Sequence, residues 1–121
     1  MTEDKVGRWP TEIRLKDKGQ NLAIAFDTGE AWEISAELLR VESPSAEVKG
    51  HGPGQETLVW GKRDVAITRL EAVGNYAVRL HFDDGHNTGI YTWTYLAKLG
   101  HEQSNILLTY EGRLLVAGLR R

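Results

Sequence analysis

Residues 21–35 read NLAIAFDTGEAWEIS and contain two runs in which every second residue is apolar. Because successive side chains of a β-strand point to opposite faces, a period of two is typical of a strand with one buried face. The segment 27–29 between the runs supplies an aspartate and a glycine, which suit a tight turn. These residues therefore predict an antiparallel hairpin with one face in a core. That face carries Leu22, Ile24, Phe26, Trp32 and Ile34.

A further strand is predicted before the hairpin, and a short helix after it. Ile13 and Leu15 alternate with charged residues, and a glycine-containing segment at 18–21 provides the turn into the hairpin. The first third therefore predicts a three-stranded meander. The hydroxyl of Ser35 can then cap a helix by accepting a hydrogen bond from an amide of the first turn. That helix must end before Pro44, because proline disfavours helical backbone in the residue before it.

The second half predicts more strands and then a change to helical spacing. The strand residues begin with Val65 and Ile67, continue with Tyr76, Val78, Leu80 and Phe82, and return at 90–93. From Tyr95 to about Leu119 the apolar residues recur at helical spacing, with Thr94 as the expected N-cap. Gly100 and Gly112 leave one bent helix or two short helices as alternatives. The whole pattern predicts an α+β fold: an antiparallel, strand-rich single domain with a short helix after the first meander and a helical C-terminal segment.

Composition narrows the class of protein. The chain has 121 residues, a net charge of −2 and no cysteine. Nucleic-acid-binding domains usually carry a basic excess, so we expect no nucleic-acid partner. The sequence lacks an apolar run long enough to span a membrane and shows no signal peptide, so we expect a cytoplasmic protein. The lack of cysteine excludes disulfides, thiolate metal sites and cysteine nucleophiles.

Residues 43–54 read SPSAEVKGHGPG and form the most unusual segment of the chain. Their three glycines allow a turn with positive φ, whereas a phosphate cradle would need a strand before them and a helix after them. The serines at 43 and 45 lack the strand-to-helix elbow of serine hydrolases. His81 and Asp83 have the spacing of an iron oxygenase motif, but His81 is expected on the strand face opposite Phe82, Asp83 belongs to the turn predicted at 83–85, and no large catalytic domain completes the site. We therefore predict no catalytic residues.

Two motifs carry a resemblance to a known family. The segment 43–54 is followed some forty residues later by DGHNTGIYTW at 84–93, and the chain opens with WPTEI at 9–13. Together these resemble the gamma-butyrobetaine-hydroxylase-like N-terminal domain, in particular its small stand-alone bacterial members, long catalogued as a domain of unknown function. On this resemblance, residues 1–7 are a flexible N-terminus, residues 8–100 are the shared domain and residues 101–121 are a helical C-terminal tail.

The resemblance implies a metal site that this chain does not keep. In the carnitine-pathway hydroxylases the domain precedes an iron- and 2-oxoglutarate-dependent catalytic domain and binds a structural zinc through a Cys-x-Cys-x-x-Cys run and a later histidine. Here Ser43, Ser45 and Val48 occupy the cysteine positions, and His86 matches the histidine. A hydroxyl is a poor zinc ligand and valine is none. We therefore predict no cofactor and no zinc of the family kind.

If the two motifs fold beside each other, imidazole and carboxylate groups would converge there. Such nitrogen and oxygen ligands suit iron, manganese or zinc in an open site. The group comprises Glu42, Glu47, His51, Asp84 and His86, and the candidate metal ligands among them are His86, His51, Glu47 and Asp84. The alternative is a small polar patch, formed by Glu47, His51 and His86, that binds no metal. The candidate interaction residues are Ser43, Ser45, His51 and Trp93.

Two functions remain from different classes. The first is a non-catalytic accessory or protein-interaction module without the catalytic domain. The second, which the resemblance implies because similar domains are appended to plastid Mrp-type iron–sulfur carrier ATPases, is a metal-binding or iron–sulfur-assembly-related adaptor. Both functions require a protein partner, and the oligomeric state is open, with a homodimer as one alternative. A small hydrolase or oxygenase has the least support.

Overall fold

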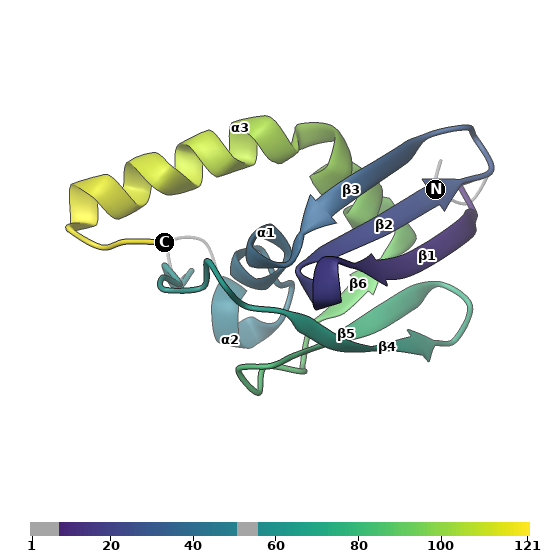
Figure 1. Ribbon diagram of the computed structural model, residues 1–121, viewed down its shortest axis with the longest axis horizontal. Helices are drawn as coiled ribbons and strands as arrows, with labels where there is room; N and C mark the ends of the chain where they lie inside the picture. The colour runs from purple at the N-terminus through teal and green to yellow at the C-terminus, as the bar shows by residue number, and fades with distance from the viewer. Residues whose placement is uncertain (1–7, 51–55) are drawn as a thin grey trace.

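The protein folds as two small antiparallel sheets and a set of helices (Figure 1). The computed structural model describes residues 8–50 and 56–121. The strands are β1 Pro10–Lys16, β2 Asn21–Phe26, β3 Ala31–Ser35, β4 Ile67–Val73, β5 Ala77–Phe82 and β6 Ile90–Thr92. The helices are α1 Ala36–Val41, α2 Ala46–Lys49 and α3 Trp93–Ala117, with a 3-10 turn, η2, at Asp17–Gly19. The predicted α+β class is confirmed.

The first sheet is the predicted meander, with strand order β1-β2-β3. The hairpin register pairs Leu22 with Ile34 and Ile24 with Trp32, so the alternating apolar residues share one face. Trp32 is half-buried, whereas we expected it to be buried. It lies on the edge strand β3, where its ring packs edge-on to Phe26 at a centroid distance of 6.2 Å.

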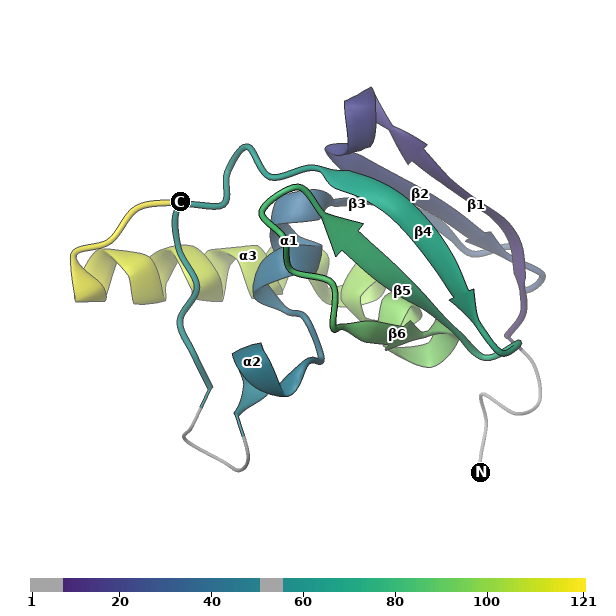
Figure 2. The same cartoon turned by 90° about the horizontal axis from the view of Figure 1, so that it is seen from below.

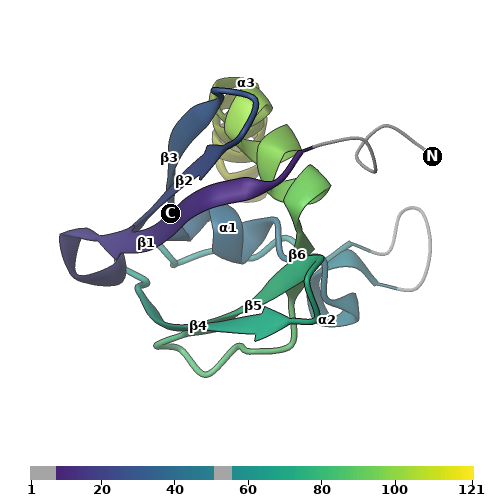
Figure 3. The same cartoon turned by 90° about the vertical axis from the view of Figure 1, so that its right-hand side faces the viewer.

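The second sheet has strand order β4-β5-β6, with β5 in the centre. The apolar face of β5, Val78, Leu80 and Phe82, is buried as predicted. Tyr76 is exposed, because it lies in the β4–β5 turn before the strand begins. Figure 3 shows the two sheets one above the other with α1 beside both. Residues of both sheets, α1 and the first part of α3 pack into one apolar core.

Each of the two short helices, α1 and α2, begins at a serine whose hydroxyl caps the first turn. The Ser35 Oγ accepts a hydrogen bond from the Leu38 amide at 3.1 Å, so the predicted cap of α1 is confirmed. The helix α2 is a difference from the sequence analysis, which expects only a glycine turn within residues 43–54. Ser45 caps this single turn by accepting from the Glu47 amide at 3.2 Å, and Gly50 ends it with a φ of 73°. The residues that follow, including His51, lie outside the described part of the chain.

The long helix α3 is continuous, so neither two helices nor a break at Gly100 is observed. The helix needs a glycine at position 100, because a Cβ there would lie only 2.6 Å from the Trp32 ring. The cap is Thr92, whose Oγ1 accepts from the Tyr95 amide at 3.1 Å, rather than the expected Thr94. Consequently β6 ends before Trp93, which does not continue the strand face of Tyr91.

The C-terminal half of α3 extends beyond the sheets (Figures 1 and 2). A second apolar cluster, formed by Val41, Tyr110 and Leu114, holds it to the rest of the chain. The predicted division at residue 100 falls inside α3, and residues 1–7 lie outside the described ranges, so that division stays a prediction. Within the described ranges, every helix is too short or too polar to cross a membrane.

Candidate functional site

The described part of the first motif, residues 43–50, lies beside the second motif at 84–93 and next to α1. Ser43 lies 2.9 Å from His86, measured from Oγ to Nε2. Ser45 lies 2.7 Å from Thr88, measured between the hydroxyl oxygens. The first and third positions of the motif at 43–54 therefore each contact a side chain of the motif at 84–93. This is the arrangement on which the expected polar patch depended.

His86 is the centre of a hydrogen-bonded chain. Its Nδ1 lies 3.0 Å from the Glu47 Oε1. A carboxylate can only accept, so Nδ1 carries the proton, and Nε2 of the neutral ring accepts from the hydroxyl of Ser43. The Ser43 Oγ in turn accepts from the Ser45 amide at 3.2 Å. Every polar atom of the imidazole is thus paired while the ring is neutral.

The surroundings of His86 favour this neutral form. The residue is 6% exposed, and burial lowers its pKa because a charged imidazole loses hydration there. The positive charge of Arg40 lowers the pKa further, and the carboxylate of Glu47 opposes the shift only in part. Both the hydrogen-bond pattern and the electrostatics therefore support a neutral histidine.

The order serine, histidine and glutamate is that of a catalytic triad, which sequence reasoning did not anticipate. A nucleophile must reach a substrate carbon, yet Ser43 is 0% exposed. A Cβ placed on Gly89 would overlap the Ser43 Oγ, so the hydroxyl is tightly enclosed on that side as well. In this conformation the three groups tie the two motifs together and present no nucleophile.

Asp84 is held by two cations. Its Oδ2 lies 2.8 Å from the Arg40 Nε and 2.6 Å from the Lys62 Nζ. Burial alone would raise the pKa of Asp84, but the hydrogen bonds from Lys62, the His86 amide and Arg40 outweigh it and hold that pKa well below its usual range. The carboxylate is therefore charged and already paired, which leaves little capacity for a metal ion.

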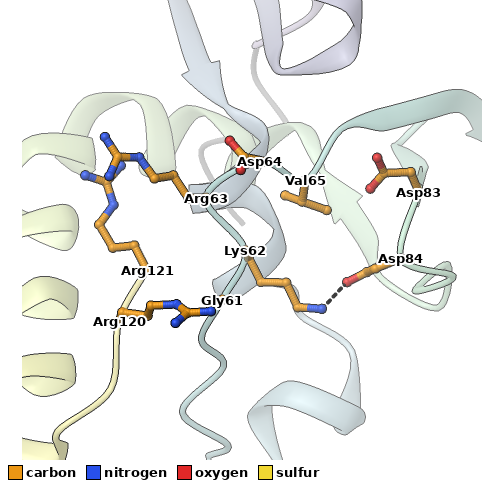
Figure 4. A pocket seen from close by; sticks show the side chains of 9 residues that line it. All are labelled: Gly61, Lys62, Arg63, Asp64, Val65, Asp83, Asp84, Arg120 and Arg121. Carbon is orange, nitrogen blue, oxygen red and sulfur yellow. Dashed lines mark ion pairs between the residues drawn. The ribbon is translucent and has the colours of Figure 1, made fainter.

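A polar cavity of about 570 Å³ adjoins Asp84 (Figure 4). It is lined by Gly61, Lys62, Arg63, Asp64, Val65, Asp83, Asp84, Arg120 and Arg121. Lys62 is paired with Asp84, and Arg121 is paired with Glu37 at 2.7 Å. These ion pairs neutralise much of the positive charge, so the cavity has no strong preference for an anion.

The predicted interaction residues are distributed unevenly over the fold. Ser43 and Ser45 are buried, so they support the surface and cannot contact a partner in this conformation. Trp93 is half-buried against the core, and its Nε1 donates to the Asn75 carbonyl at 2.9 Å. Of the predicted interaction residues that the structure describes, only Trp93 is partly exposed.

Comparison with known proteins identifies the family. The family model described as gamma-butyrobetaine hydroxylase-like, N-terminal, matches residues 13–97. The chain belongs to this family. The resemblance carried by the two motifs is therefore confirmed. No curated protein matches the chain.

Solved structures support the same conclusion. One solution NMR structure is 45% identical with a TM-score of 0.83, and covers 100% of this chain and 90% of its own. A second is 38% identical with a TM-score of 0.81, and covers 95% of this chain and 90% of its own. A crystal structure at 1.93 Å from Acidithiobacillus ferrooxidans ATCC 23270, a DUF971 family protein with unknown function, is 40% identical with a TM-score of 0.63 over 75% of this chain and 91% of its own.

The zinc site that the family resemblance implies does not fit the residues present. Ser43 and Ser45 are engaged with His86 and Thr88, and Val48 offers no ligand atom. Both nitrogens of His86 already have hydrogen-bond partners. Among the described residues, no group of three or more histidines, aspartates and glutamates is placed to hold a metal ion. A hydrogen-bonded chain therefore involves Ser43, Ser45 and His86, three of the four positions at which the resemblance implies zinc ligands.

We expect a metal chelator to leave the melting temperature unchanged, because the described residues offer no group of ligands that could hold a metal ion. The positive control is Ser43→Cys, Ser45→Cys and Val48→Cys combined. This variant should bind one zinc per chain and become sensitive to the chelator, because structural zinc contributes directly to folding. Elemental analysis and thermal unfolding with and without chelator measure both effects. Chelator-induced destabilisation of the wild type would contradict the expectation.

Stability should fall as the pH is lowered from 7 to 5. The pKa of His86 is lower in the folded chain than in the unfolded chain. Its contribution is therefore fully present above the unfolded pKa near 6.5 and is lost as the pH falls toward the folded pKa. One proton gives a slope of at most about 1.4 kcal/mol per pH unit.

Chemical unfolding of the wild type and His86→Asn at several pH values measures this contribution. The variant should show a shallower pH dependence, whereas His101→Asn, which alters an exposed histidine of α3, should follow the wild type. Equal slopes for wild type and His86→Asn would show that the buried imidazole is not linked to folding.

Proposed function

We propose that the chain is a non-catalytic protein-interaction module. The polar side chains of Ser43, Asp84 and His86 support this proposal, because each already has hydrogen-bond or ion-pair partners within the protein. Ser43 is enclosed, His86 is neutral and bonded at both nitrogens, and Asp84 is paired with two cations. Acid–base and nucleophilic chemistry need a group with free access to a substrate, and these residues do not provide one.

The observation that carries the proposal is an exposed apolar face on the C-terminal half of α3. Leu108, Leu115 and Val116 are 68%, 81% and 90% exposed. They lie on the side of the helix opposite Tyr110 and Leu114, which pack inward. Helices with apolar residues on both sides usually bury both, and clustered exposed apolar side chains mark interaction sites. We define the outer face of α3 as Leu108, Leu115 and Val116.

The composition of the chain suits the cytoplasm, a compartment in which such a module would meet other proteins. The sequence contains no cysteine, which suits a reducing compartment such as the cytoplasm. Its net charge of −2 gives no general attraction to nucleic acid. A protein is therefore the partner class that the outer face fits best.

Affinity capture with a charge placed on the outer face tests the function. Leu108→Glu and Leu115→Glu together should abolish capture of a protein that the wild type retains. Tyr76→Glu is the matched control, because it also replaces an exposed apolar side chain by a carboxylate, but in the β4–β5 turn. Mass spectrometry should show one protein retained by the wild type and by the control and absent with the double variant. Identical captures by all three would refute a role for the outer face.

A further inference from the structure

The two glycines of α3, Gly100 and Gly112, lie in different structural surroundings. Glycine inside a helix is about 1 kcal/mol less favourable than alanine, so each needs an explanation. At Gly100 the Trp32 ring leaves no room for a Cβ. At Gly112 a Cβ would have nothing within 4 Å among the described residues, so packing does not demand a glycine there. What Gly112 does is leave a hollow on the surface of α3.

That hollow belongs to a groove along one side of α3. One cavity of about 540 Å³ is lined by Leu58, Thr109, Gly112, Arg113 and Val116. A second of about 210 Å³ is lined by Glu42, Asn105, Ile106, Thr109, Tyr110 and Arg113. The two cavities share Thr109 and Arg113, so they are neighbouring parts of one depression. We call this depression the α3 groove.

The lining of the α3 groove specifies the chemistry of a ligand. Leu58, Ile106 and Val116 offer apolar contacts, and Gly112 lets a ligand approach the helix closely. Arg113 borders both cavities and has no ion-pair partner among residues 8–50 and 56–121. The only carboxylate of the lining, Glu42, is paired with Lys49 at 3.0 Å. The unneutralised charge in the groove is therefore positive.

We infer that the α3 groove binds a short peptide segment of a partner protein that carries an apolar side chain next to a carboxylate. The apolar side chain lies over Gly112 between Leu58 and Val116, and the carboxylate pairs with Arg113. This inference rests on the proposed function and names the chemistry of the partner. Val116 belongs to both the outer face and the groove, whereas Leu108 and Leu115 do not line the groove, so the variants that test the two proposals change different residues.

The test uses amide NMR spectra of the full chain with two capped dipeptides as probes, acetyl-Asp-Leu-amide and acetyl-Lys-Leu-amide. The acidic probe should shift the amides of Thr109, Gly112 and Val116 and bind about tenfold more tightly than the basic probe, because charge pairing with Arg113 is replaced by repulsion. Arg113→Glu should reverse this preference. A preference that stays the same in Arg113→Glu would overturn the inference.

Gly112→Leu supplies a test by filling the groove. Leucine favours helix over glycine, so the variant should melt no lower than the wild type while losing the shifts caused by the acidic probe. Ser104→Leu adds the same side chain at an exposed position of α3 outside the groove and should bind the probe normally.

The outcomes separate the two proposals. Unchanged binding in Gly112→Leu, or no shifts with either probe, overturns the groove, even where Leu108→Glu with Leu115→Glu still abolishes capture and the interaction function stands. Shifts at the same amides that grow with protein concentration and without any probe would identify a second copy of this chain as the occupant and would also overturn the peptide inference.

Discussion

Replacement of Leu80 by alanine is expected to lower the free energy of unfolding by about 2–5 kcal/mol. Leu80 lies in the central strand of the second sheet, is 0% exposed and pairs with Leu70 of β4. The change removes buried methyl groups and leaves a cavity that the surrounding sheet and helices fill only in part. For a chain of this size the melting temperature should fall by roughly 10 °C or more.

Leu115→Ala is the matched control, because it makes the same chemical change at a leucine that is mostly exposed. Its effect should stay within about 0.5 kcal/mol when unfolding is measured in dilute solution. Denaturant titrations followed by tryptophan fluorescence give both values. If Leu80→Ala also cost less than about 0.5 kcal/mol, the register of β5 would be displaced by one residue, since such a shift moves every side chain to the other face.

The strands were predictable because their signals are local. In the first sheet, alternation places Leu22 and Ile34 on one face, and the turn between the strands contains a glycine where positive φ is needed, Gly29. The same reasoning located β5 and the Ser35 cap. Each of these features depends on residues only a few positions apart, so no tertiary information was required.

The errors arose where tertiary contacts decide between local alternatives. Thr92 and Thr94 can both cap a helix, and the choice depends on where β6 stops pairing with β5. Gly100 indicates a break by propensity alone, yet the Trp32 ring occupies the space that a side chain would need, and the helix continues. The single turn of α2 follows from Ser45, but its four residues are too short for a periodic signal.

The candidate site was predictable only in outline. The contacts of His86 with Ser43 and Glu47 span 43 and 39 residues, so no local pattern reveals them. The two family motifs indicated that these segments meet, and the structure supplied the hydrogen-bonded chain. The α3 groove was missed altogether, because it forms where Leu58 lies against a helix some fifty residues later.

Replacement of Gly19 by alanine is the second change with a large expected effect. Gly19 is buried in η2 with a φ of 88°, a region that side chains rarely adopt. A Cβ there would overlap the Ile67 carbonyl oxygen of β4, so the backbone of one sheet would have to move away from the other. Backbone strain costs about 1–3 kcal/mol and overpacking a similar amount, so we expect a loss of about 2–6 kcal/mol.

Gly29→Ala separates these two causes. Gly29 has a φ of 93°, close to that of Gly19, but a Cβ there would meet nothing within 4 Å. It should therefore show the strain alone, about 1–3 kcal/mol, and Gly19→Ala should cost more by the amount of the clash with Ile67. Chemical unfolding of both variants measures the difference. Because β4 and the first sheet share one core, the difference between the two losses reports how closely η2 holds the two sheets together. Equal losses for the two variants would mean that Gly19 does not approach Ile67 closely in solution.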